Sequence, residues 1–391
     1  MKLHCTLPSL ALLLAAPVSA TDLSWSAFGT LGYARSDREF NYERFTDDSG
    51  TIKRDSLLGL QGTAEFSPRW SATVQARLAP SISDDHKWDA SLPWAFLSYR
   101  PGNDLLLRAG KLRMPMYLYS ENMDVGASYA MMRMPTEVYS TAPTTDYTGA
   151  SFSKSWPLAW GDLSLDGYAG RSSVQPRNAG GGNVGSTGGA TELHTRTGGL
   201  VLSLRNGDDT YRMGWQRALI GISAGFFGNP PAGAGDFTSA APGTDVLAPG
   251  SVLSNGGELD TRVWLLGADV GVGNDFRFVS EYARRRVVNA ITPKNTQGAY
   301  ASLLYQSGPW TPYVTMGRLL TDKAARQSSS SGYFDDQSSA ALGVSYALTP
   351  SSKLKAELMH VKVRSGSSFI DDAAASDKRL NVMSLSYSVS Y

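Results

Sequence analysis

The chain closes on the stretch Met383-Ser384-Leu385-Ser386-Tyr387-Ser388-Val389-Ser390-Tyr391. In it, apolar side chains alternate strictly with serines. Successive side chains of a β-strand point to opposite faces, so a period of two puts all the apolar side chains on one face and all the serines on the other. The stretch therefore predicts a two-faced strand that ends on an aromatic residue.

The same alternation recurs along the chain and predicts an all-β protein. Two runs, 105–112 and 310–320, leave open which of their residues share a face. The clearest examples of the alternation are 58–66, 70–78, 200–205, 211–216, 264–270 and 342–348.

Short connections rich in Pro, Gly, Asn and Asp alternate with long polar ones, and each short one joins two strand-like runs as a hairpin turn does. The short connections are 67–69, 100–104, 157–161, 206–209, 273–275, 307–309 and 349–352. The long ones are about 34–53, 79–90, 113–146, 171–193, 218–260, 284–296, 321–337 and 365–378. This pattern predicts a closed antiparallel transmembrane β-barrel of about 16 strands, with short periplasmic turns and long extracellular loops.

Lipid outside and water inside would explain why one strand face is apolar and the other polar. No later stretch has the ~20 apolar residues that a spanning helix needs. Aromatic residues at expected strand ends favour a membrane barrel over a soluble exported β-protein, because they fit girdles at the two interfaces. Ordinary hydrophobic strand ends are the alternative explanation. The aromatic residues concerned are Trp70, Trp94, Trp156, Trp160, Trp310 and Tyr391.

The N-terminus predicts a secretory signal at 1–20, with Lys2, an apolar run at 7–16 and the small-residue cleavage site Val18-Ser19-Ala20. Residues 21–391 would then form the mature barrel. Cleavage removes Cys5, the only cysteine, and lowers the 36 Lys and Arg residues by one, to match the 35 Asp and Glu residues. Because nucleic-acid binders carry a basic footprint, we expect no nucleic-acid partner.

Catalytic patterns are scarce in the mature chain. Its histidines are His86, His194 and His360, and only Asp84-Asp85-His86 sets acids beside one of them. We therefore expect no enzyme activity, no metal site and no cofactor. Two alternatives stay open: an outer-membrane enzyme of the protease or lipase type, and a non-conducting adhesin or structural barrel.

The predicted arrangement resembles the 16-stranded porins of Gram-negative outer membranes. The stretch Leu107-Arg108-Ala109-Gly110-Lys111-Leu112-Arg113-Met114-Pro115, followed by Glu121-Asn122, is similar to a region of the phosphate-selective porin superfamily. The Pro-Glu-Phe-Gly-Gly motif of general porins is absent. The resemblance implies a homotrimer in the outer-membrane lipid that lets small polar solutes or ions diffuse passively. It also implies that the barrel assembly machinery binds the strand at 383–391.

The same resemblance implies that the connection 113–146 folds inward and narrows the barrel. Charges at such a constriction set selectivity, because a narrow low-dielectric passage focuses their field on passing ions. Candidate loop groups are Glu121, Asp124, Arg133, Glu137 and Asp146, with solvated outer surface as the alternative for the acids. Candidate groups on the polar strand faces are Gln61, Glu65, Gln75, Arg108, Arg212, Lys355 and, with the clearest register, Arg77. The basic residues at 108–113 slightly favour anions.

Overall fold

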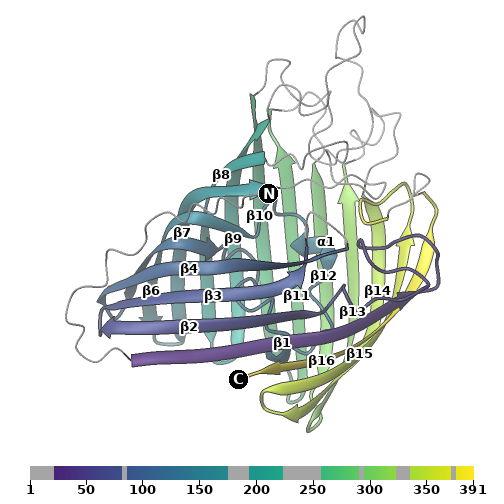
Figure 1. Cartoon of the computed structure of the whole chain (residues 1–391), viewed down its shortest axis with the longest axis horizontal. Coiled ribbons are helices and arrows are strands. Elements are labelled where there is room, and N and C mark those ends of the chain that lie inside the picture. The colour runs from purple at the N-terminus through teal and green to yellow at the C-terminus, as the bar shows by residue number, and fades with distance from the viewer. Residues whose placement is uncertain are drawn as a thin grey trace, which may run out of the picture.

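The computed structural model describes residues 22–81, 86–174, 193–222, 257–289, 295–322, 335–370 and 376–391, so the predicted signal at 1–20 lies outside the described residues. These residues form 16 strands in one closed barrel (Figure 1). The strands are β1 (Asp22–Ser36), β2 (Leu57–Ser67), β3 (Trp70–Pro80), β4 (Trp88–Gly102), β5 (Leu105–Arg113), β6 (Asp146–Leu158), β7 (Gly161–Val174), β8 (Leu193–Asn206), β9 (Asp209–Ile222), β10 (Gly257–Val272), β11 (Phe276–Val287), β12 (Thr296–Tyr305), β13 (Trp310–Thr321), β14 (Asp336–Thr349), β15 (Ser352–Val363) and β16 (Arg379–Ser390).

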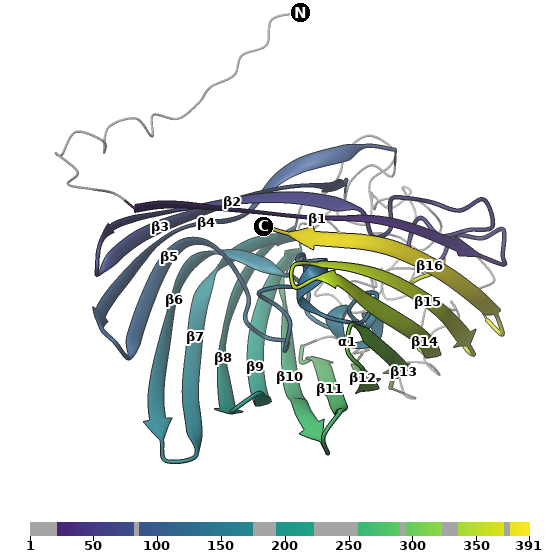
Figure 2. The same cartoon turned by 90° about the horizontal axis from the view of Figure 1, so that it is seen from below.

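Each strand pairs antiparallel with the next one along the chain, and β1 pairs with β16 to close the barrel. The closing register runs from Phe28 opposite Ser390 to Ser36 opposite Val382. Figure 2 shows the first and last strands side by side. Among the described residues, no helix has the length and apolar character needed to cross a membrane.

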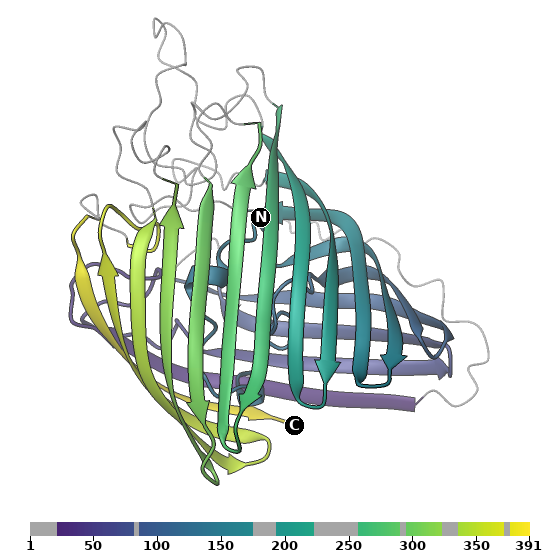
Figure 3. The same cartoon turned by 180° about the vertical axis from the view of Figure 1, so that it is seen from behind.

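The connections confirm the predicted asymmetry between the two ends of the barrel. All seven predicted short connections join consecutive strands as turns, and they gather at one end (Figure 3). The strand ends that the eight long connections join lie at the other end. Both β1 and β16 therefore have their free ends on the short-turn side.

The two faces of the strands differ as the alternation predicts. In β16, Met383 and Leu385 are about half exposed on the outer surface, whereas Ser384 and Ser386 are buried inside. The two runs with undecided faces are resolved in the same way, since Leu107 points outward from β5, and Val314 and Met316 point outward from β13. An apolar exterior around a polar interior is the arrangement expected of a barrel in lipid.

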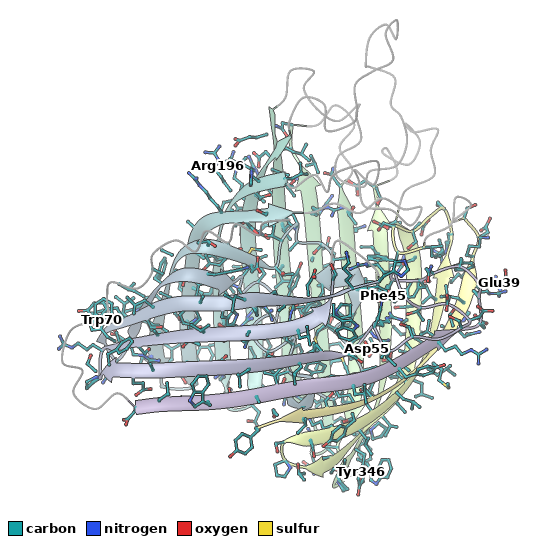
Figure 4. The ribbon with its side chains drawn as sticks, viewed as in Figure 1. Glu39, Phe45, Asp55, Trp70, Arg196 and Tyr346 are labelled. Carbon is teal, nitrogen blue, oxygen red and sulfur yellow. The ribbon has the colours of Figure 1, made fainter. Side chains whose placement is uncertain are left out.

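Aromatic pairs mark the turn end of the outer surface. Trp70 of β3 packs against Tyr99 of β4, and Trp310 of β13 against Tyr346 of β14, each with ring centroids 4.5 Å apart. Figure 4 shows Trp70 and Tyr346 at the outer edge of the barrel. The prediction for Trp94 was wrong, because β4 begins at Trp88 and carries Trp94 in its middle, opposite the inward-facing Gln75.

A substitution pair on β2 tests the assignment of faces. Leu60 is half exposed on the outer face, and its neighbour Gln61 faces the interior. Leu60→Arg should lower the free energy of unfolding by about 2–4 kcal/mol, because a charge then faces hydrocarbon. Gln61→Arg should leave it within about 1 kcal/mol, since its side chain faces a polar interior. Urea unfolding in lipid vesicles measures both, and equal losses would contradict the assignment.

Candidate functional site

The connection between β5 and β6, residues 114–145, lies inside the barrel and is called the interior loop below. It contains a short 3-10 helix, η1 (Gly126–Ser128), and one helical turn, α1 (Thr136–Tyr139). Figure 2 shows α1 within the ring of strands. The 3-10 helix contacts β1 and β16, and α1 contacts β11, β12 and β13.

Apolar packing holds the interior loop against one part of the wall. Met116, Met131 and Val138 are buried in a cluster with inward-facing side chains of β8 and β10 to β13. Two glycines of that wall make room for α1. A Cβ added at Gly298 would lie 1.8 Å from the Glu137 carbonyl oxygen, and one at Gly317 would lie 2.7 Å from the Glu137 carboxyl carbon. Larger residues at these positions would push α1 away from the wall.

Asp124 ties the interior loop to the opposite wall through two arginines. Its carboxylate accepts hydrogen bonds from Arg77 of β3 at 3.0 Å and from Arg113 of β5 at 2.5 Å. Burial opposes ionisation of Asp124, but the two guanidinium groups outweigh it and hold the pKa of this carboxyl below its usual value. The contact therefore keeps a charged carboxylate between two cations.

Arg133 makes the most extensive set of polar contacts in the interior loop. It donates two hydrogen bonds to Asp55 in the connection between β1 and β2, at 2.8 and 2.9 Å. It also donates to Glu357 of β15 at 3.0 Å and to Ser384 of β16 at 2.7 Å. Although burial raises the pKa of Asp55, the charge of Arg133 more than compensates and lowers it overall. One side chain thus joins the interior loop to both edges of the barrel closure.

A third contact group joins the interior loop to β10 and β11. Tyr139 and Tyr300 donate their hydroxyls to the Glu281 carboxylate, each at 2.9 Å, and Tyr119 donates to Asp269 at 2.8 Å. Burial raises the pKa of Tyr139, with a further contribution from Glu281. The Tyr139 hydroxyl therefore stays protonated and acts as a donor.

Most of the predicted site residues contact the interior loop. Arg108 lies 3.7 Å from Glu121, and Arg212 donates to the carbonyl oxygen of Tyr117. Lys355 donates to the carbonyl oxygen of Met131 at 2.8 Å. The predicted wall residues Arg77 and Arg108 thus pair with the predicted loop acids Asp124 and Glu121. The predicted loop residue Arg133 pairs with two other acids of the barrel interior, Asp55 and Glu357.

Other predicted residues have different surroundings. Gln75 donates a hydrogen bond to Gln61 at 3.0 Å, and the structure describes no hydrogen bond between Gln75 and the interior loop. Glu65 lies near the turn end of β2, opposite Ser71, away from the loop. Glu137 is buried against β14, where the amide nitrogen of Gln337 lies 3.4 Å from its carboxylate. Burial raises the pKa of Glu137. Asp146 begins β6 on the outer face, 3.6 Å from Lys111, so it does not belong to the interior site.

Sequence reasoning missed the acids and cations of the first long connection. Asp55 lies just beyond the predicted connection 34–53, but the structure includes it in this connection, where it meets Arg133 inside the barrel. In the same connection, Arg54 pairs with Glu43, which accepts a hydrogen bond from Thr136 of the interior loop at 2.7 Å. No pattern in the sequence marks a second connection that folds inward.

The interior loop and the first connection enclose a cavity of about 390 Å³. Charged side chains of both signs line it, together with the rings of Tyr129 and Tyr139. Its charged residues are Arg54, Asp55, Asp124 and Arg133. A polar cavity bounded by fixed, mutually paired charges is suited to passing or selecting small hydrophilic solutes.

The histidines do not build a catalytic group with these residues. His194 of β8 and His360 of β15 lie on outward faces, and the ring Nδ1 of His360 is 2.9 Å from Asn381 Oδ1. His86 is exposed, and Asp84 and Asp85 lie outside the described residues.

A closed antiparallel barrel with an apolar exterior and a polar interior belongs to the class of outer-membrane β-barrel proteins. The sequence profile of the Gram-negative porin family matches residues 8–366, so the chain belongs to this family and is an outer-membrane porin. The barrel of about 16 strands and the resemblance to porins, both predicted from the sequence, are thus confirmed. A comparison with curated protein sequences gives no match.

Solved structures with the same fold are similar over nearly the whole chain. OmpT of Vibrio cholerae, folded in vitro, is 12% identical with a TM-score of 0.57, covering 96% of this chain and 100% of its own. An anion-selective porin from Comamonas acidovorans is 11% identical with a TM-score of 0.57, covering 95% and 100%. The outer membrane channel DcaP of Acinetobacter baumannii is 11% identical with a TM-score of 0.54, covering 95% and 97%. At these identities the likeness concerns the fold.

Arg133→Met tests whether the charge contacts hold the interior loop in place. The substitution leaves the buried carboxylates of Asp55 and Glu357 without their cation, and loss of one partner of a buried pair costs about 3–5 kcal/mol of unfolding free energy. Arg196→Met is the matched control, because Arg196 pairs with Glu258 on the exposed outer rim, where such pairs contribute about 0–1 kcal/mol. Urea unfolding in vesicles, with protease digestion of the loop as a second readout, compares them. Equal stability of the two variants would refute a structural role for Arg133.

Proposed function

We propose that this porin conducts small polar solutes and ions by passive diffusion, with its narrowest part at the interior loop. The observation that carries the proposal is the set of contacts that fix this loop to opposite walls. Asp124 meets Arg77 of β3 and Arg113 of β5 on one side, and α1 packs against β11, β12 and β13 on the other. A loop held at both sides restricts the passage while leaving a polar lining.

The fixed charges around the loop favour anions slightly. Guanidinium groups keep their charge at any pH a protein tolerates. Among the described ion pairs that hold the interior loop and the first connection, arginines and carboxylates are equal in number, and Lys355 adds one further cation, which donates to the carbonyl oxygen of Met131. The arginines are Arg54, Arg77, Arg108, Arg113 and Arg133, and the carboxylates are Glu43, Asp55, Glu121, Asp124 and Glu357. Such an imbalance at a constriction biases ion passage more than the total charge of the chain does.

We also propose that the protein performs no chemistry. Its family is one of channels, and most of the charged side chains described at the interior loop form ion pairs instead of grouping around a nucleophile. The test is hydrolysis of a chromogenic ester or peptide by the purified protein. Hydrolysis that is abolished by substituting a residue inside the barrel would contradict the proposal.

We further propose a homotrimer, supported by a structural neighbour that is described as a trimer form of OmpT from Vibrio cholerae. The expected result is a mass of three chains by native mass spectrometry of the unheated protein, and of one chain after heat denaturation. A single-chain mass under the native condition would exclude the trimer.

Planar-bilayer recording tests the channel and its selectivity. The purified wild type should give stepwise, ohmic conductance and a reversal potential in a salt gradient that favours anions weakly. Arg77→Ala removes one cation beside Asp124 and should shift the reversal potential toward cations. Arg69→Ala, in the exposed turn before β3, is the matched control and should not shift it. Absence of stepwise conductance would overturn the channel and favour the adhesin or enzyme alternatives, and an unchanged potential in Arg77→Ala would remove Arg77 from the selective region.

A further inference from the structure

A second cavity of about 280 Å³ lies on the long-loop side of the interior loop. Its floor is formed where α1 ends, and its sides come from the loop ends of β11 to β13 and from the first connection. Polar and apolar side chains share the lining. The cavity is lined by Glu43, Arg44, Ser140, Thr141, Arg285, Thr296, Leu319, Asp335, Ser368 and Phe369.

Arg285 is the unusual residue in this lining. Its side chain points inward from β11 and is only 7% exposed. It donates one hydrogen bond, from Nη2 to the hydroxyl of Thr296 at 3.1 Å, and its Nε is buried without a partner. In the part of the chain that the structure describes, no carboxylate lies within ion-pair distance of it. Arg285 is therefore a buried cation without a counter-charge.

Such a group is costly for the protein. An arginine stays ionised, and a buried charge without a partner loses its hydration without an ionic contact in return. The buried side chains of Arg54 and Arg113 avoid this cost, because each has a carboxylate partner, Glu43 and Asp124 respectively. A residue kept buried, charged and incompletely bonded at the wall of a cavity indicates a ligand of opposite charge.

The two carboxylates in the lining are already bonded to other groups. Glu43 pairs with Arg54 and accepts the hydroxyl of Thr136. Asp335 accepts the backbone N–H and the hydroxyl of Ser368, at 2.9 and 2.8 Å. No ion pair joins Arg285 to either of these two described carboxylates, and its Nε has no partner, so the guanidinium has donors to offer to a solute.

We propose that this cavity binds a small organic anion, with its carboxylate on the Arg285 guanidinium and its apolar part against Leu319 and Phe369. The volume of about 280 Å³ lies just below the roughly 300–1,000 Å³ common for ligand pockets, which suits a single small ring or short chain. The site is at the long-loop entrance to the interior loop, where it would raise the local concentration of anions before passage. In this respect it rests on the proposed function as a channel.

Binding to the full-length protein in detergent tests the site without conductance. The probe is benzoate, and benzamide is its neutral counterpart. Arg285→Met should weaken benzoate binding in calorimetric titration at least tenfold, and benzamide should bind the wild type at least tenfold more weakly than benzoate. Arg286→Met is the matched control, because Arg286 is the next residue of β11 and lies exposed on the outer face. Equal benzoate affinity in the wild type and Arg285→Met would overturn the proposal.

Thermal unfolding gives a second readout that a merely structural arginine would not produce. Without benzoate, Arg285→Met should be at least as stable as the wild type, because the substitution removes an uncompensated buried charge. Benzoate should raise the melting temperature of the wild type and of Arg286→Met but not of Arg285→Met. A destabilised Arg285→Met whose melting temperature benzoate raises as in the wild type would refute the site. A protein that binds benzoate but never conducts would instead refute the channel and leave the binding site standing.

Discussion

In the hydrocarbon layer a backbone N–H or C=O group finds no water, so each must be bonded within the protein. A sheet of strands meets that requirement only when its first strand pairs with its last, because an open sheet leaves backbone groups unpaired at its two edges. The pairing of β1 with β16, from Phe28 opposite Ser390 to Ser36 opposite Val382, meets it here. All else follows from closure: an inside separated from an outside, two kinds of strand face, and an enclosed space in which a loop can be held.

Closure also explains why so much of the fold could be predicted from the sequence. A strand between lipid and water must alternate, and a turn between adjacent strands must be short, so local patterns carry the architecture. The inward positions of Arg77 and Arg212 followed from this alternation. Trp94 did not, because β4 extends further toward the loop end than its pattern indicates, and its pairing with β3 is shifted between Gln75 and Arg77.

The interior site was only half predictable for a related reason. The sequence marked Asp124 and Arg133 as loop charges, but their partners depend on the path of the loop through the barrel. Asp55 comes from another connection and Glu357 from a strand more than two hundred residues away from Arg133. Tertiary contacts of this kind have no local period. The same holds for Arg285, whose importance lies in the missing counter-charge and not in any motif.

The contacts of Arg133 depend on closure of the barrel. This side chain bonds to Asp55 near the start of the barrel and to Glu357 and Ser384 near its end, so its full set of bonds requires β16 to be paired with β1. A barrel that is still open could hold its strands together but could not complete these bonds. Only the closed barrel therefore anchors its interior loop at every one of these points.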